Sequence, residues 1–375
     1  MVTAVVMIGP APEPEALSAG KPDPRRWVQL ARRAATRDLL SQLAGQSQLE
    51  RVVVLSPSAA DLAGIADFDH VVTPPGPLHV GRALAEAVAR FDIRRLLYLG
   101  GGSTPLLDDL TLGRAIDQLA RAETLVLANN LFATDWAGVT PARAVVQWQE
   151  RLPKDNMLGW VLSAEGGLPA EALPPSAASR LDIDTPGDLL TLALHPGAKQ
   201  HLRRSLENMP LDTGDLERAL AVLATPASQV FIAGRLAPEA WAALNEVTRC
   251  WVRVISEERG MVSSGRLARG EVYSILGELI DHLGLPAFFD RLAQQAGAAL
   301  VDSRVLMAHR GRWPSEADRF ASDLGLVDQI QDPWLRDFTV QAVQAPIPVV
   351  LGGHGLLSGD LYALCDLLSS GIRDW

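Results

Sequence analysis

Short runs of apolar residues alternate with longer amphipathic segments along most of the chain. The apolar runs are continuous rather than interrupted by polar residues, which is typical of strands covered by helices on both faces. Apolar positions three and four residues apart in the intervening segments predict helices. In the first half, these patterns predict strands at 3–9, 51–57, 70–74, 94–100, 124–130 and 179–184, and helices at 27–44, 80–90 and 112–121.

The second half of the chain continues this alternation without repeating the sequence. Strands are predicted at 229–234, 251–256, 298–307 and 347–352, with amphipathic helices between them. The β-α-β-α order predicts doubly wound, mostly parallel sheets. We therefore expect an α/β protein with a Rossmann-like N-terminal domain at 1–197, a helical linker at 198–226 and a second α/β domain at 227–375.

Composition and charge narrow the classes of partner. The 375 residues carry a formal net charge of −10, and an acidic surface repels phosphate backbones, so we expect no nucleic acid partner. No apolar run reaches the roughly 18–20 residues that cross a bilayer. The segment Met1–Pro10 lacks the basic residues of a signal peptide. Two distant cysteines indicate neither a zinc site nor a disulfide framework. We expect a cytoplasmic protein without a membrane partner.

In open parallel sheets, ligands bind beyond the carboxyl ends of the strands, so residues that directly follow a strand are the first candidates. Gly9 ends the first predicted strand, and the loop after it runs to Lys21. Lys21 is one of only three lysines in the chain. The loop would bring an ammonium group to an anionic ligand; the alternative is a solvated, proline-rich connector.

Three consecutive glycines follow the strand at 94–100. Gly100, Gly101 and Gly102, with Ser103 after them, form a turn in which the backbone can approach a ligand closely. The alternative is a tight turn between strand and helix that binds nothing. Three glycines are more than such a turn needs, and this favours a binding site.

Two carboxylates mark a third strand end. Asp182 and Asp184 alternate on the predicted strand at 179–184 and therefore point the same way. Two carboxylates on one face suit a hard divalent cation. The alternative is that they belong to the cap of the helix that starts at Thr185-Pro186.

Together these features resemble the GT-A-like nucleotidyltransferases, in particular the molybdenum-cofactor nucleotidyltransferases and the phospholactate guanylyltransferases. The resemblance covers about residues 1–195 and rests on the loop ending in lysine, the Gly-rich turn followed by PLL, and the sequence DIDTPGDL. It implies a GT-A-like fold, a nucleoside triphosphate, a Mg²⁺ cofactor and a small-molecule acceptor whose phosphate or hydroxyl attacks the α-phosphorus. It further implies that Lys21 assists the phosphates and that Asp184, with Asp182, binds the metal.

The sequence departs from this family at two places. Gly9 is followed by prolines instead of a glycine-rich loop, and Ser103 stands where the family has a metal-binding aspartate. A hydroxyl cannot supply the charge of that carboxylate. Two hypotheses follow. The first is Mg²⁺-dependent transfer of a nucleotidyl group to a small phosphorylated metabolite or cofactor precursor. The second is a catalytically degenerate nucleotide- or nucleotide-sugar-binding protein with a ligand-binding or regulatory C-terminal domain.

Asn130 and Asp135 follow the predicted strand at 124–130, at the position where folds of this family contact the acceptor. We expect both to be ligand contacts. The alternative is a turn in which the asparagine bonds its own backbone and packs under Trp136.

Strand ends of the second half also carry ionisable residues and glycines, and together they would form one crevice. A third hypothesis therefore places the chemistry in the second domain, although a lone histidine is more often structural. The candidates there are Glu257, Glu258 and Arg259 after one strand, His309 and Arg310 after another, and His354 within GGHG after the last.

Overall fold

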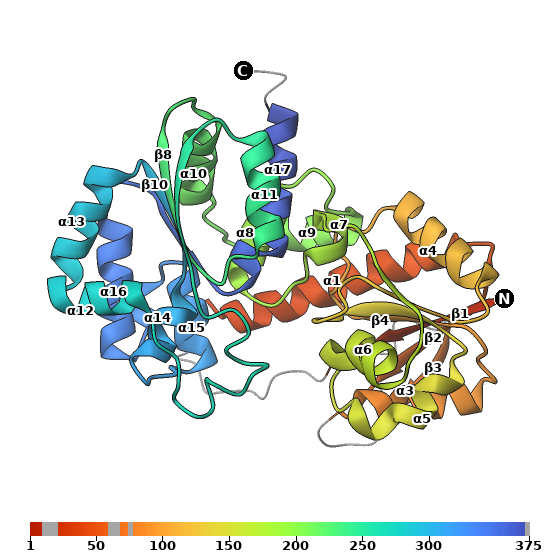
Figure 1. Cartoon of the computed structure of the whole chain (residues 1–375). Coiled ribbons are helices and arrows are strands. Elements are labelled where there is room, and N and C mark those ends of the chain that lie inside the picture. Colours follow the sequence, from red (N-terminus) through yellow and green to blue (C-terminus); the bar gives the residue numbers. More distant parts are fainter. Residues whose placement is uncertain (10–21, 59–67, 74–77, 372–375) are drawn as a thin grey trace. The chain divides into compact units, whose positions relative to one another are not determined.

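The computed structural model describes residues 1–9, 22–58, 68–73 and 78–371 (Figure 1). These residues form two compact units. Unit 1 holds the N-terminal strand, most of the chain between residues 31 and 182, and residues 199–202. Unit 2 holds residues 183–198 and 203–371, together with the first turns of helix α1 up to Leu30. Each unit contains one sheet with its own helices.

Unit 1 is built on a seven-stranded sheet. Its strand order is β3-β2-β1-β4-β6-β5-β7, and all neighbouring strands are parallel except the two pairs that β6 makes. This confirms the predicted α/β class and the mostly parallel, doubly wound sheet. The strands are β1 (Val2–Met7), β2 (Leu49–Ser56), β3 (Asp69–Val72), β4 (Leu96–Gly100), β5 (Leu125–Ala128), β6 (Trp136–Thr140) and β7 (Ala170–Ala172).

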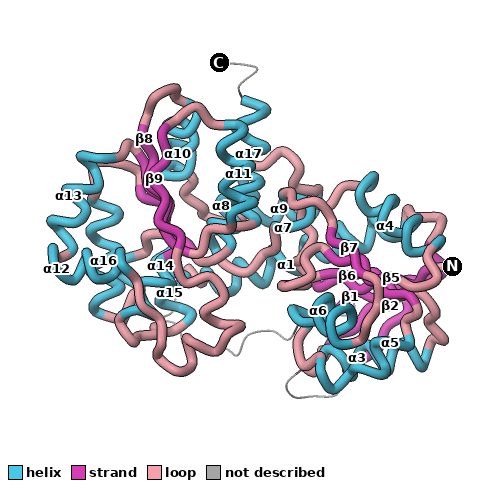
Figure 2. The backbone as a smooth tube through the Cα atoms, in the orientation of Figure 1, coloured by secondary structure: helices cyan, strands magenta, loops and turns pink. Residues whose placement is uncertain are grey.

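Helices bury both faces of this sheet, with α3 and α5 on one side and α4 on the other (Figure 2). Successive strand residues point to opposite faces, so Val5 packs with one set of helices and Val6 with the other. This explains the continuous apolar runs. The helices are α1 (Pro24–Ala44), α3 (Val80–Arg90), α4 (Asp109–Arg121), α5 (Arg143–Trp148), α6 (Leu158–Trp160) and α7 (Ala177–Arg180), with the turns η1 (Gln149–Arg151), η2 (Asp155–Met157) and η3 (Val161–Glu165).

The predicted strand at 179–184 is wrong. The start of that stretch belongs to α7, whose first turn is closed by reciprocal hydrogen bonds between Ser176 and Ser179. Residues 181–184 then run without pairing to the sheet. Buried and more exposed residues still alternate there, with Asp182 and Asp184 on the more exposed positions. A helix cap, a local interaction, therefore decides the structure of a segment that has the alternation of a strand.

Unit 2 is built on a four-stranded, wholly parallel sheet of order β11-β10-β8-β9. Its strands are β8 (Gln229–Gly234), β9 (Trp251–Ser256), β10 (Ala298–Asp302) and β11 (Val349–Gly352). The helices are α8 (Pro186–Leu194), α9 (Gln200–Glu207), α10 (Gly214–Ala224), α11 (Pro238–Val247), α12 (Ile275–Leu283), α13 (Leu285–Gln295), α14 (Ser303–His309), α15 (Glu316–Asp323), α16 (Pro333–Gln344) and α17 (Gly359–Gly371), with the turns η4 (Val327–Gln329) and η5 (Gly355–Leu357).

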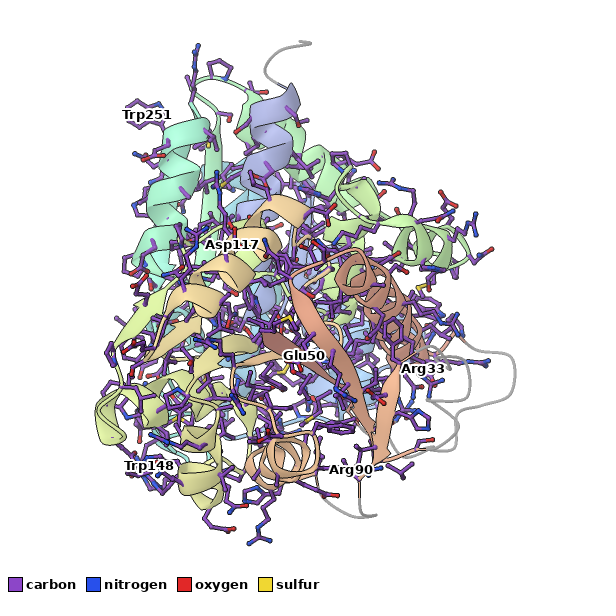
Figure 3. All side chains as sticks on the ribbon, turned by 90° about the vertical axis from the view of Figure 1, so that its right-hand side faces the viewer. Arg33, Glu50, Arg90, Asp117, Trp148 and Trp251 are labelled. Carbon is purple, nitrogen blue, oxygen red and sulfur yellow. The ribbon has the colours of Figure 1, made fainter. Side chains whose placement is uncertain are left out.

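The helices of unit 2 also lie on both faces of its sheet. In Figure 1, α12, α13 and α16 lie on one side of β8 and β10, and α10, α11 and α17 on the other. Strand β10 is shorter than predicted, because the Asp302 carboxylate accepts a hydrogen bond from the backbone of Arg304 and starts α14. Strand β9 forms the outer edge; its Trp251 is 71% exposed and extends away from the ribbon (Figure 3).

None of the described helices is long and apolar enough to cross a membrane.

The end of β8 depends on glycine. Gly234 has a φ of +129°, and a Cβ atom there would lie 2.4 Å from Cβ of Asp302. We expect Gly234→Ala to lower the free energy of unfolding by about 1–3 kcal/mol more than Gly311→Ala, because only the first adds a clash. Gly311 also has a positive φ, of +61°, but open space around it. Urea denaturation of both variants measures the difference, and equal losses would contradict the clash.

Candidate functional site

The carboxyl edge of unit 1 is organised by the glycine turn after β4. Between β1 and β4 the strand order reverses, which is where open parallel sheets bind ligands. The backbone N–H of Gly101 donates to Met7 O over 2.7 Å, so the turn lies against the end of β1. Gly102 has a φ of +94°, and a Cβ there would lie 2.7 Å from Cγ of Arg32. The turn thus requires glycine for its path and its packing.

Two further predicted residues flank this turn. The Ser103 hydroxyl donates to the carbonyl oxygen of Gly100 over 2.7 Å, so the residue in the aspartate position closes the turn. Gly9 is exposed, with open space beside it. Lys21 and the rest of its loop lie outside the described residues.

Asn129, which the sequence analysis did not select, joins the other polar residues of this edge. Its amide donates to Asp135 Oδ2 (2.9 Å) and to the carbonyl of Ser179 (3.1 Å), and its oxygen accepts from the backbone of Asp135 (3.0 Å). The side chain of the predicted Asn130 makes a local bond, accepting from the backbone N–H of Phe132 over 3.1 Å. The sequence signal that could have identified Asn129 is its position, as a polar residue directly after the apolar run Leu125–Ala128.

The buried phenol of Tyr98 bonds a carboxylate at this edge. Its hydroxyl donates to Asp155 Oδ2 over 2.7 Å. Burial, followed by the charges of Asp155 and then Asp135, raises the pKa of Tyr98 well above its usual value. Asp135 and Asp155 therefore both act on one buried phenol, which stays neutral and serves as a donor.

The DIDTPGDL segment leads from unit 1 into unit 2. Asp182 is the last residue of this stretch in unit 1, and Asp184 belongs to unit 2 and is exposed. The helix cap is made by other residues: Asp188 Oδ2 accepts from the backbone N–H groups of Asp184 (2.7 Å) and Thr185 (2.5 Å). Within the described residues, no three Asp, Glu, His or Cys side chains gather closely enough to hold a metal ion.

Asp188 has a second, unusual neighbour, Asp360 at the start of α17. Both side chains are 1% exposed, and Oδ1 of Asp188 and both oxygens of Asp360 accept no hydrogen bond from a donor in the described part of the chain. Burial, and then the charge of Asp360, raises the pKa of Asp188 well above its usual range. Burial raises the pKa of Asp360 to about 6. Burial therefore disfavours the charged form of both carboxyl groups.

Two buried ion pairs stand at the carboxyl edge of the unit 2 sheet. Arg235, directly after β8, donates to both oxygens of Asp302 at the end of β10, over 2.5 and 3.0 Å. Arg304 donates to both oxygens of Asp323 over 2.5 and 2.6 Å. Burial opposes the charge of Asp302, but Arg235 outweighs it and keeps the pKa of Asp302 below its usual value.

The predicted His354 lies among these groups. Its side chain reaches solvent, yet desolvation by the surrounding protein, together with the guanidinium of Arg235, lowers its pKa to about 4. Asp302, Arg259 and Asp184 also act on its charge. His354 is therefore a neutral imidazole at pH 7, able both to donate and to accept a hydrogen bond.

His309 and Arg310 contact helix α12. Nδ1 of His309 accepts from the backbone of Ser274 over 3.1 Å, and its ring packs against Gly277. Arg310 forms an ion pair with Asp281 and lies over the ring of Trp334 at 4.9 Å. The structure thus brings His354 together with the strand-end charges and gives the other two predicted residues packing partners.

Comparison with solved structures finds proteins that are weakly similar to about half of this chain. A cytidylyltransferase from Leptospira borgpetersenii is 15% identical, with a TM-score of 0.38 over 56% of this chain and 98% of its own. A 4-diphosphocytidyl-2C-methyl-D-erythritol synthase from Anaerococcus prevotii is 8% identical, with a TM-score of 0.32 over 46% of this chain and 86% of its own. CMP:2-keto-3-deoxy-manno-octonic acid synthetase complexed with CTP is 11% identical, with a TM-score of 0.31 over 46% of this chain and 89% of its own. No protein-family model and no curated protein matches the sequence.

The raised pKa of Asp360 makes stability depend on pH. Because the pKa of Asp360 is raised to about 6 in the fold, the unfolded chain loses its proton first, and this residue's contribution to stability falls as the pH rises from about 4 to 6. Asp360→Asn keeps a donor and cannot ionise. The free energy of unfolding of Asp360→Asn minus that of wild type should therefore increase by about 2–3 kcal/mol between pH 4 and pH 7.

The control is Asp337→Asn, at an exposed position on α16. Denaturant unfolding of both variants and wild type across this pH range measures the effect. A constant difference between Asp360→Asn and wild type at all pH values would contradict the raised pKa of Asp360.

Proposed function

We propose that unit 1 binds a nucleoside triphosphate and transfers its nucleotidyl group to a small phosphorylated metabolite. The observation that carries this proposal is that hydrogen bonds gather the Gly100–Ser103 turn, Asp135 and the segment leading to Asp182 at one edge. The carbonyl oxygen of Asp135 accepts from the turn, and the amide of Asn129 donates to the Asp135 carboxylate and to the carbonyl of Ser179. Ligands of open parallel sheets bind at this edge. The DIDTPGDL resemblance supports the same chemistry.

Each part of the edge has a role in this reaction. The glycine turn offers backbone without side chains to the triphosphate, and Lys21 adds a positive charge to it. An oxygen of the acceptor phosphate attacks the α-phosphorus. The bond from that phosphorus to the bridging oxygen breaks, and pyrophosphate leaves with the electron pair. Gly9, Asn130 and Asp135 would contact nucleotide and acceptor.

Carboxylates of this edge fit Mg²⁺ as a cofactor. Mg²⁺ prefers oxygen ligands and usually takes one or two carboxylates together with substrate phosphates. Asp182 and Asp135 provide such carboxylates within unit 1. When bound, the cation would neutralise charge on the triphosphate.

A second candidate function is nucleotide binding without transfer. The observation that favours it is Ser103, whose hydroxyl donates to Gly100 and which carries no charge for a metal. In that case unit 1 would bind a nucleotide or nucleotide sugar, and unit 2 would have a ligand-binding or regulatory role. Release of pyrophosphate from a bound nucleotide in the presence of acceptors separates the two candidates.

Asp182→Asn should weaken nucleotide binding about tenfold or more when Mg²⁺ is present and have little effect in EDTA, because only the metal-bound complex loses a ligand. Isothermal titration of ATP, GTP, CTP and UTP, each with and without Mg²⁺, measures this. The control is Asp92→Asn, which removes the same charge from an exposed position with a φ of +47° that asparagine tolerates. Absence of binding by every nucleotide to the folded protein would refute the proposal.

A further inference from the structure

Every strand of the unit 2 sheet is followed within two residues by an ionisable residue. Because all four strands are parallel, these residues meet at one edge. The strand order reverses between β8 and β10, which makes that point of the edge the expected ligand crevice. The residues are Arg235 after β8, Glu257, Glu258 and Arg259 after β9, Asp302 and Arg304 at the end of β10, and His354 after β11.

The two buried ion pairs fix guanidinium groups at this edge. Taking paired charges out of water costs about as much as the pairing returns, so such pairs are weak evidence for stability. Their clear effect is to fix the position of the guanidinium groups. Asp302 is fully buried and holds Arg235, whose side chain is only 11% exposed, by two hydrogen bonds.

Arg235 keeps donors for a ligand. Asp302 uses its Nε and Nη2, and Nη1 has no acceptor among the described residues. The buried polar atoms that lack a partner within the described chain do not include Nη1 of Arg235. Nη1 is therefore accessible to solvent. A carboxylate holds this guanidinium from one side, and the other side still presents N–H groups. Such an arrangement is suited to binding an anion.

The acidic residues after β9 are occupied elsewhere. Glu257 accepts from the side chain of Ser274 and from the backbone of Ile275 (2.9 Å), which caps α12. Glu258 forms an ion pair with Arg266 over 2.6 Å. Arg259, next in the chain, is exposed and acts on the charge of His354.

We propose that this edge of unit 2 binds a phosphoryl group of a small ligand, through Arg235, Arg259 and His354. The three donors follow three different strands, so a separate loop supplies each of them. A tetrahedral phosphate accepts from such donors on separate oxygens, whereas a carboxylate matches one planar fork. Asp302 is neutralised by Arg235, and Asp184 is the remaining carboxylate that acts on His354. Arg235, Arg259 and His354 all belong to unit 2.

Isothermal titration of the full chain with inorganic phosphate, at constant ionic strength, tests this proposal. Saturable binding should weaken about tenfold or more in Arg259→Ala, since a charge-assisted hydrogen bond is lost. The matched control is Arg249→Ala, which removes the same charge from an exposed position before the other end of β9 and should change affinity less than twofold. His354→Ala should also weaken binding, and circular dichroism checks that each variant is folded.

Asp182→Asn separates this site from the nucleotide site, because it should leave phosphate binding unchanged. If phosphate does not saturate the wild type, or if Arg249→Ala and Arg259→Ala weaken binding equally, the proposal is overturned. Loss of phosphate binding in Asp182→Asn alone would place the anion in unit 1 and would equally overturn it. Titration with malonate, a dicarboxylate, tests whether the site prefers a phosphoryl group. If malonate binds as tightly as phosphate, the proposed phosphoryl ligand is contradicted.

Discussion

Parallel pairing of the strands is the constraint on which the rest of this structure depends. A helix must return the chain after each parallel strand, so helices bury both faces of each sheet. Side chains on the faces are therefore apolar, as Val5 and Val6 on opposite sides of β1 illustrate. Only the edges remain for polar chemistry. In both units, ionisable and glycine residues gather at the carboxyl edge, where consecutive strands end together.

The two units organise this edge by different means. In unit 1, the neutral amide of Asn129 holds Asp135 and the carbonyl of Ser179, and glycines let the turn after β4 lie on the end of β1. In unit 2, buried charge is balanced locally. Arg235 neutralises Asp302, and Arg304 pairs with Asp323. Groups paired in this way cannot reorient without exposing an unpaired charge, so the edge is preorganised.

Periodicity in the sequence predicted the α/β class and the parallel sheets, because apolar runs report directly on burial from both sides. It failed where a local hydrogen bond overrides the pattern: the caps made by Ser176 and by Asp302 replace predicted strand with helix. His354 was visible as a polar residue after a strand. The pairing of Arg235 with Asp302 was not, since these residues are 67 positions apart and meet only through the order of strands.

The central claim is that a nucleotide binds at the glycine turn of unit 1. Hydrogen–deuterium exchange of the full chain, with and without a nucleoside triphosphate and Mg²⁺, tests it most directly. Binding should slow exchange in peptides covering residues 100–104 and 129–136 and leave those covering 352–358 unchanged. Slowed exchange confined to residues 352–358 would place the nucleotide in unit 2 and contradict the claim.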